Sequence, residues 1–126
     1  MADPLRPRKL FQSFRHAFRG IGEMLRTETN ARIHALASIL AVSAGFALSI
    51  DRIEWLVLTL TLAAVWSLEA VNTAFEALCN VASPDHHPQV ERAKDVAAGA
   101  VLIAAIAALV VAGLIFGRKI LALVAS

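Results

Sequence analysis

A stripe of polar side chains follows directly on an apolar stretch of this chain. Residues 55–68 carry no charge over fourteen positions, and the stripe begins at the next residue. Its members are Glu69, Asn72, Thr73, Glu76 and Asn80. At about 100° per residue, spacings of three and four place these side chains on one face of a single helix. A charge at the bilayer centre costs about 2.5–3.5 kcal/mol, so we expect this face to line a protein cavity and to meet a cation, a proton or a ligand.

The composition is that of an integral membrane protein. Hydrophobic residues make up 58% of the 126 residues, and the mean hydropathy is +0.65. Three long apolar stretches account for these values, and about 20 apolar residues are enough to cross a bilayer. We therefore predict an all-α membrane protein with a single domain, residues 1–126, and three transmembrane helices. Their expected bounds are about 31–50, 53–81 and 91–117.

The N-terminal region predicts a helix that lies on the membrane surface. Residues 1–8 form a polar tail with two prolines, which we expect to be mobile. Over residues 9–26, apolar side chains recur every three or four positions, and arginines occupy most of the other side. Such a helix lies in the headgroup plane, where its arginines suit anionic lipids. Nucleic-acid binding is a poor alternative, because the net charge is only +2 and the aromatic side chains are needed for lipid.

The distribution of basic residues predicts the orientation of the chain. Arginines and lysines are concentrated before the first span, which favours a cytoplasmic N-terminus. Three spans then place residues 83–95 in the cytoplasm and the C-terminus on the outer side. Arg118 and Lys119 lie on the less usual side of the membrane in this arrangement.

Counting along the second span gives the depth of the acidic residues. Residues 51–54 form a short outer turn, and Trp55 marks the outer interface. At 1.5 Å per residue, Glu69 lies about 21 Å and Glu76 about 31 Å from Trp55. We therefore expect Glu69 somewhat below the cytoplasmic surface and Glu76 at that surface. Glu28, Lys94 and Asp95 belong to the same cytoplasmic layer.

This layer has the composition of a phosphoryl-transfer site. Carboxylates beside an amide and a lysine suit Mg²⁺, which completes its coordination with phosphate oxygens and water. Phosphoryl transfer needs charge neutralisation, positioning and a base for the incoming hydroxyl, and Glu69 is the candidate base by its depth. There is no Walker loop or protein-kinase signature. His86 and His87 are adjacent and point apart, which disfavours a zinc site.

Three classes of protein fit these observations. They are a lipid-modifying enzyme, a proton or cation pathway, and a structural bundle held together by polar contacts. A pathway needs acidic residues at several depths, whereas the outer halves of all three predicted spans are apolar. This counts against a channel and leaves the enzyme as the preferred interpretation.

Two segments resemble the signature of a known family. Residues 69–76 (EAVNTAFE) and 93–102 (AKDVAAGAVL) are similar to motifs of the prokaryotic diacylglycerol kinases, a family that includes the undecaprenol kinases. The resemblance extends over about residues 14–116. It implies a homotrimer in the bacterial inner membrane that transfers the γ-phosphate of ATP to a lipid alcohol with the help of Mg²⁺. It also implies that neighbouring subunits share each active site.

The resemblance also implies roles for individual residues. Glu69 corresponds to the general base, and Asn72 to a polar residue of the active site. Glu28 and Glu76 correspond to ligands of the metal ion and the nucleotide. The other implied nucleotide-binding residues are Lys9, His16, Asp85, His86, His87, Lys94 and Asp95. The implied contacts of the lipid substrate are Arg32, Trp55, Glu69 and Ala98.

Two departures within the family bear on the substrate. Asn80 stands where many relatives carry an aspartate, so one negative charge is lost at the end of the stripe. Residues 28–34 (ETNARIH), 54–55 (EW) and 83–88 (SPDHHP) resemble the undecaprenol kinases more than the enterobacterial diacylglycerol kinases. We therefore expect a polyprenol as the substrate, with diacylglycerol as the alternative.

Overall fold

Four α-helices make up the part of the protein that the computed structural model describes, residues 6–126. They are α1 (Pro7–Thr27), α2 (Thr29–Ala47), α3 (Arg52–Ala82) and α4 (Pro88–Val124). The predicted all-α fold is thus confirmed. Most of the tail expected at residues 1–8 lies outside the described residues. Arg6 is the N-cap of α1, and residues 7 and 8 belong to the helix, which starts earlier than residue 9 because Pro7 occupies a favourable position in the first helical turn.

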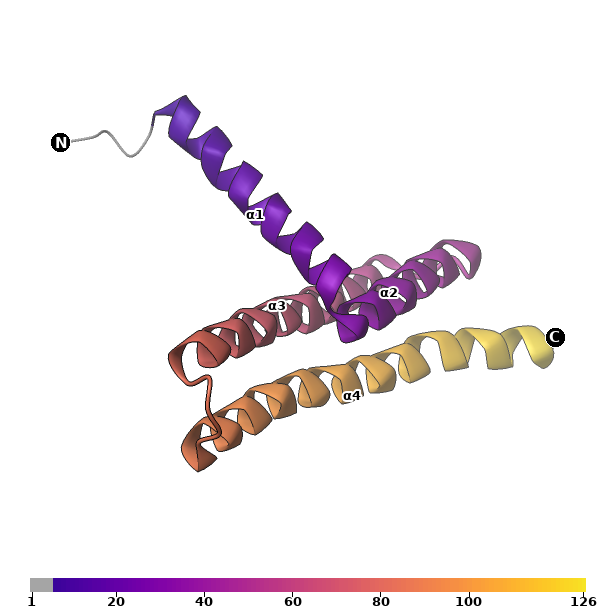
Figure 1. The fold of residues 1–126 in the computed structure, drawn as a ribbon. Helices are drawn as coiled ribbons and strands as arrows, with labels where there is room; N and C mark the ends of the chain where they lie inside the picture. The colour runs from indigo at the N-terminus through magenta and orange to yellow at the C-terminus, as the bar shows by residue number, and fades with distance from the viewer. Residues whose placement is uncertain (1–5) are drawn as a thin grey trace.

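The helices form a layered arrangement around α3. Figure 1 shows α3 and α4 side by side and antiparallel, joined by a short loop at one end, with α2 packed across α3. The N-terminal half of α1 projects away from the other three helices, and α1 contacts α2 and α3 near its C-terminal end. There Met24 is buried. The structure therefore places α1 apart from the helical bundle, as an amphipathic helix on a membrane surface requires.

Local sequence signals explain where the helices begin. Asp51 and Glu54 form a reciprocal capping box at the start of α3, in which each side chain accepts a hydrogen bond from the backbone N–H of the other. Pro88 is compatible with the first turn of α4. That helix extends beyond both ends of the expected range 91–117, since no residue after Gly117 interrupts helical hydrogen bonding before Val124.

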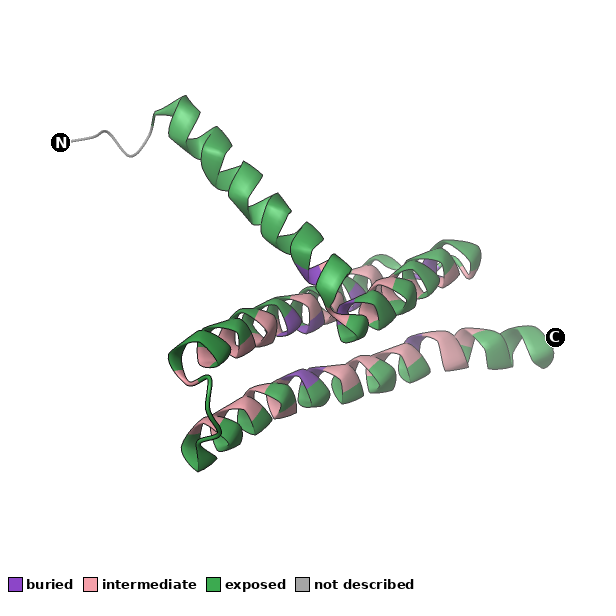
Figure 2. Cartoon of the chain, viewed as in Figure 1, coloured by how far each residue is buried: buried purple, intermediate pink, exposed green. Residues whose placement is uncertain are grey.

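The surface of the helices suits a lipid environment. Figure 2 shows that most of each helix is exposed. The exposed side chains include leucines and isoleucines on all four helices and phenylalanines on α1 and α2. An apolar surface of this extent is not tolerated in water but is covered by acyl chains in a bilayer. Within residues 6–126, α3 and α4 are long and apolar enough to cross a membrane. The first predicted span, residues 31–50, corresponds to α2, whose first turns carry Asn30, Arg32 and His34. That α2 crosses the membrane stays a prediction.

A close contact joins the ends of α2 and α3. The Trp55 ring lies against Phe46, with ring centroids 4.8 Å apart, and it also covers Gly45. A Cβ atom added to Gly45 would lie 2.6 Å from Trp55 Cη2, which is too short for a stable contact. Ile50 and Leu58 are buried nearby in the same apolar cluster. The missing side chain at residue 45 is therefore what allows α2 and α3 to approach each other here.

We predict that Gly45→Ala destabilises the protein by about 1–3 kcal/mol, because the added methyl group forces Trp55 out of its position. Thermal unfolding in detergent micelles measures the change. Gly113→Ala is the matched control, since nothing lies within 4 Å of a Cβ at that position. The control should be neutral or slightly stabilising, because alanine has the higher helix propensity. Equal unfolding temperatures for the two variants contradict the proposed packing.

Candidate functional site

Glu69 is the most deeply buried polar residue in the described part of the chain. It is 1% exposed, although it belongs to a helix whose aliphatic side chains are largely accessible. It borders a cavity of about 220 Å³, together with Asn30, His34, Asn72 and Ala98. His34 Nε2 on α2 lies 3.6 Å from Glu69 Oε2 on α3. We call this space the acceptor cavity.

Three buried oxygen atoms of the stripe are left without partners. Glu69 Oε2, Asn72 Oδ1 and Thr73 Oγ1 make no hydrogen bond to any described residue. Each unsatisfied buried polar group costs about 1–3 kcal/mol. Side chains held at this cost are typical of binding and catalytic sites, where a ligand supplies the missing partner.

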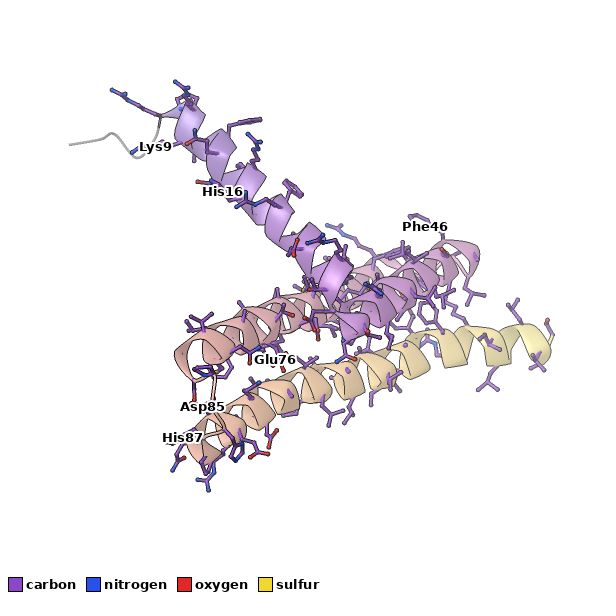
Figure 3. All side chains as sticks on the ribbon, viewed as in Figure 1. Lys9, His16, Phe46, Glu76, Asp85 and His87 are labelled. Atoms are coloured by element: carbon purple, nitrogen blue, oxygen red, sulfur yellow. The ribbon has the colours of Figure 1, made fainter. Side chains whose placement is uncertain are left out.

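A second cavity lies where α3 and α4 are joined. Its volume is about 510 Å³, and we call it the nucleotide cavity after the predicted role of its lining residues. It brings together most of the predicted nucleotide-binding residues, namely Glu76, Asp85, His86, His87, Lys94 and Asp95. Figure 3 shows Glu76, Asp85 and His87 toward this end of the two helices. The gathering follows from the antiparallel α3–α4 pair, because the last turns of one helix face the first turns of the other.

The two cavities lie next to each other along the polar stripe. Ala98 lines both of them, and the charges of Glu28 and Glu76 both act on Glu69. The three carboxylates are therefore close enough to repel one another, and their depth in the bilayer stays a prediction. No three histidine, cysteine, aspartate or glutamate side chains within residues 6–126 are placed to hold one metal ion.

Several side chains of the nucleotide cavity also hold the structure together. Lys94 Nζ donates a hydrogen bond to Asn80 Oδ1 at 3.1 Å, which links α4 to the end of the stripe. His86 Nε2 lies 3.4 Å from a carboxylate oxygen of Glu91. His87 is the N-cap of α4, and its Nδ1 accepts a hydrogen bond from the Gln89 N–H at 3.2 Å.

Five of the predicted site residues line neither cavity. Glu28 is one of them, and it is the N-cap residue of α2. Lys9 and His16 are on the projecting part of α1, far from the loop with Asp85 (Figure 3). The Arg32 guanidinium donates through Nε to the Leu25 carbonyl at 2.9 Å and through Nη2 to the Arg26 carbonyl, so it holds the junction between α1 and α2. Trp55 packs on Phe46 at the opposite end of α3.

The structure adds His34 and Asn30 to the candidate site, which the sequence did not assign. His34 borders the acceptor cavity and a neighbouring apolar cavity of about 270 Å³, which is lined mostly by aliphatic side chains of α2, α3 and α4. The one feature of the sequence that could have identified His34 is the presence of a histidine within an apolar stretch. Its pairing with Glu69 depends on the register between two helices, which no spacing within one helix reveals.

The comparisons with known proteins decide the family. The family model described as "Prokaryotic diacylglycerol kinase" matches residues 15–116. This chain belongs to the prokaryotic diacylglycerol kinase family. It is 40% identical over 112 residues to the undecaprenol kinase of Bacillus subtilis (strain 168), covering 89% of this chain and 91% of that protein. It is 38% identical over 115 residues to the diacylglycerol kinase of Synechocystis sp. (strain ATCC 27184 / PCC 6803 / Kazusa). That match covers 90% of this chain and 66% of the relative.

Membership in the diacylglycerol kinase family confirms the resemblance seen in the two sequence motifs. The chain is a lipid kinase, and its apolar helices associate it with a membrane. Both motifs lie in the matched region, and they supply Glu69 and Ala98 to the acceptor cavity and Glu76, Lys94 and Asp95 to the nucleotide cavity.

The capping role of His87 leads to a prediction. His87→Ala should lower the stability of the ligand-free protein by about 1 kcal/mol, because the Gln89 N–H at the start of α4 loses its acceptor. His87→Asn should restore most of the loss, since asparagine is a strong N-cap residue. Thermal unfolding without nucleotide measures both variants. A His87→Ala protein as stable as the original contradicts the capping role.

Proposed function

We propose that this protein transfers the γ-phosphate of MgATP to the hydroxyl group of a membrane lipid, preferably undecaprenol. The observation that carries the proposal is the buried carboxylate of Glu69, which borders a small cavity next to the larger one that gathers Lys94 and acidic residues. One helix face thus connects a place for a hydrophobic alcohol with a place for a water-soluble phosphate donor. Both relatives described above carry names of lipid alcohol kinases, which supports this class of substrate.

The nucleotide cavity has the charges that a triphosphate requires. Lys94 supplies a cation that can contact phosphate oxygens, and its present partner is the neutral amide of Asn80 rather than a carboxylate. His86 and His87 add further polar groups on the side of the joining loop. The cavity of about 510 Å³ lies within the size range of small-ligand sites.

Glu28 and Glu76 are the proposed ligands of Mg²⁺. This ion is usually held by one or two carboxylates and completes its octahedral shell with phosphate oxygens and water. Glu76 lines the nucleotide cavity, and Glu28 lies at the N-cap of α2, from where its charge also acts on Glu69. Two carboxylates are enough for such a site. When bound, the ion neutralises charge on the transferring phosphoryl group.

Glu69 is the proposed general base. Its free Oε2 accepts the proton of the lipid hydroxyl, and the hydroxyl oxygen forms a bond to the γ-phosphorus. The bond between that phosphorus and the oxygen that bridges it to the β-phosphate breaks, and ADP leaves. Asn72, whose Oδ1 also lacks a partner, accepts a hydrogen bond that orients the substrate. Exclusion of water by the surrounding helices favours transfer to the lipid over hydrolysis.

The apolar cavity beside His34 supports a polyprenol as the substrate. Its mostly aliphatic lining offers space for part of a hydrocarbon chain whose hydroxyl end enters the acceptor cavity. A polyprenol is a single hydrocarbon chain that ends in a hydroxyl. Diacylglycerol has a second chain and two polar ester groups. The mostly aliphatic lining of this cavity offers few hydrogen-bond donors for those esters.

The proposed assembly is a homotrimer in the bacterial inner membrane, with α2, α3 and α4 spanning the bilayer and the N-terminus in the cytoplasm. Two observations support it. Large apolar side chains of α2, such as Ile33, Ile39 and Phe46, are exposed in the single chain. Lys9 and His16 lie far from the nucleotide cavity of their own chain (Figure 3), so we propose that they contact ATP in a neighbouring subunit.

The kinase reaction itself is tested with purified protein, labelled ATP, Mg²⁺ and vesicles that contain either undecaprenol or diacylglycerol. We expect labelled undecaprenyl phosphate as the main product. Preferential labelling of diacylglycerol contradicts the proposed substrate. Proton or cation flux in vesicles without ATP consumption supports the pathway alternative instead.

We predict that Glu69→Gln lowers kcat by about 10²–10⁴-fold, since the amide cannot accept the hydroxyl proton. Nucleotide binding should persist, because Glu69 lies outside the nucleotide cavity. Steady-state kinetics and equilibrium ATP binding measure the two effects. Glu23→Gln is the control, because Glu23 pairs with Arg26 on the exposed face of α1. Near-normal turnover of the Glu69 variant removes this residue from the role of base.

A magnesium titration tests the metal ligands. Glu28→Gln and Glu76→Gln should each raise the Mg²⁺ concentration for half-maximal activity about 10-fold or more, because each removes a charged oxygen ligand. Glu23→Gln should leave the titration unchanged. If the three curves coincide with that of the original protein, the proposed ligands are wrong.

A further inference from the structure

We propose that His34 is a positioning residue that holds the Glu69 carboxylate toward the lipid hydroxyl. This inference rests on the proposed function and deepens it. The distance of 3.6 Å between His34 Nε2 and Glu69 Oε2 is longer than a hydrogen bond. Catalytic hydrogen bonds are often long before substrate binds and shorten in the reactive complex. The Nε2–H of His34 is therefore placed to donate to Glu69 once the acceptor cavity is filled.

The surroundings of Glu69 explain why it needs such a partner. Glu28 and Glu76 both act on it with charges of the same sign. Among residues 6–126, His34 is the one basic residue whose side-chain nitrogen lies within 4 Å of the Glu69 carboxylate. A donor from α2 can fix which way the carboxylate points, and without it both oxygens are free to turn away from the cavity.

A neighbouring contact ties α2 to α3 close to His34. One helical turn further along α2, the Ser38 hydroxyl donates to the His34 carbonyl at 2.7 Å. The same hydroxyl accepts a hydrogen bond from Trp66 Nε1 on α3 at 2.9 Å. Trp66 lies three residues before Glu69, so this contact joins the two helices about one turn away from the His34–Glu69 pair.

This arrangement separates two roles that a buried histidine can have. The Trp66–Ser38 hydrogen bond already ties α2 to α3, so the fold does not depend on the His34 imidazole for that purpose. His34 instead borders both the acceptor cavity and the apolar cavity. A lipid whose chain occupies the apolar cavity therefore brings its hydroxyl past His34 to reach Glu69.

The test compares two variants of similar size. His34→Leu removes the donor, and His34→Gln keeps an N–H donor at a similar reach. We expect His34→Leu to lower kcat about 10–100-fold with little change in the KM for ATP. His34→Gln should recover most of the lost turnover. Steady-state kinetics with undecaprenol vesicles, together with thermal unfolding, measure activity and folding separately.

Trp66→Phe is the matched control for helix docking. It removes the neighbouring tie between α2 and α3 without touching Glu69, so it should lower the unfolding temperature and keep kcat within a few-fold of the original. If Trp66→Phe loses as much turnover as His34→Leu, the effect is one of helix register and the proposal is overturned. Equal kcat values for His34→Leu and the original protein overturn it as well.

A double variant distinguishes this proposal from the proposed function. If His34 acts through Glu69, adding His34→Leu to Glu69→Gln should cause little further loss, because the carboxylate to be positioned is already gone. Losses that multiply show that His34 acts independently, which contradicts the positioning role while the kinase assignment stands. Full turnover of Glu69→Gln alone overturns the base assignment and this role with it.

Discussion

The burial of one carboxylate determines how this small protein is organised. Glu69 is 1% exposed, whereas Leu60 and Leu109 are more than 70% exposed on the neighbouring surfaces. A buried acid beside exposed leucines is the reverse of the pattern in a water-soluble domain. Such an arrangement is stable only where hydrocarbon surrounds the helices. Placing an acid there requires other polar groups close by. The polar stripe of α3, His34 on α2 and the small side chains of α4 meet around Glu69 for this reason.

Helix geometry turns that burial into a separation of two environments. Glu69 and Glu76 lie on the same face of α3, and seven residues correspond to about 10.5 Å along the axis. Glu76 borders the nucleotide cavity at the joined ends of α3 and α4, and Glu69 borders the acceptor cavity deeper in the bundle. Under the proposed function, a lipid alcohol can therefore reach this helix face from the bilayer, and a charged phosphate donor can reach it from water. Neither molecule has to leave the solvent that suits it.

The features that depend on one helix at a time were predictable from the sequence. The helical fold, the polar stripe and the loop that brings Asp85 near Lys94 all follow from periodicity and from the order of the helices. The contacts of His34, Ser38 and Trp66 depend on how two helices are rotated and shifted against each other, and the sequence contains no direct measure of that register. Arg32 shows the same limit, because its hydrogen bonds go to the carbonyls where α1 turns into α2.

The identity of residue 98 has a consequence for the reaction. Ala98 contributes to the walls of both cavities, so the partition between them has only a methyl group at this position. Under the proposed function, a small side chain here leaves space between the phosphate donor and the lipid acceptor. A bulky residue at this position would intrude on both cavities at once, so one substitution could obstruct the donor and the acceptor together.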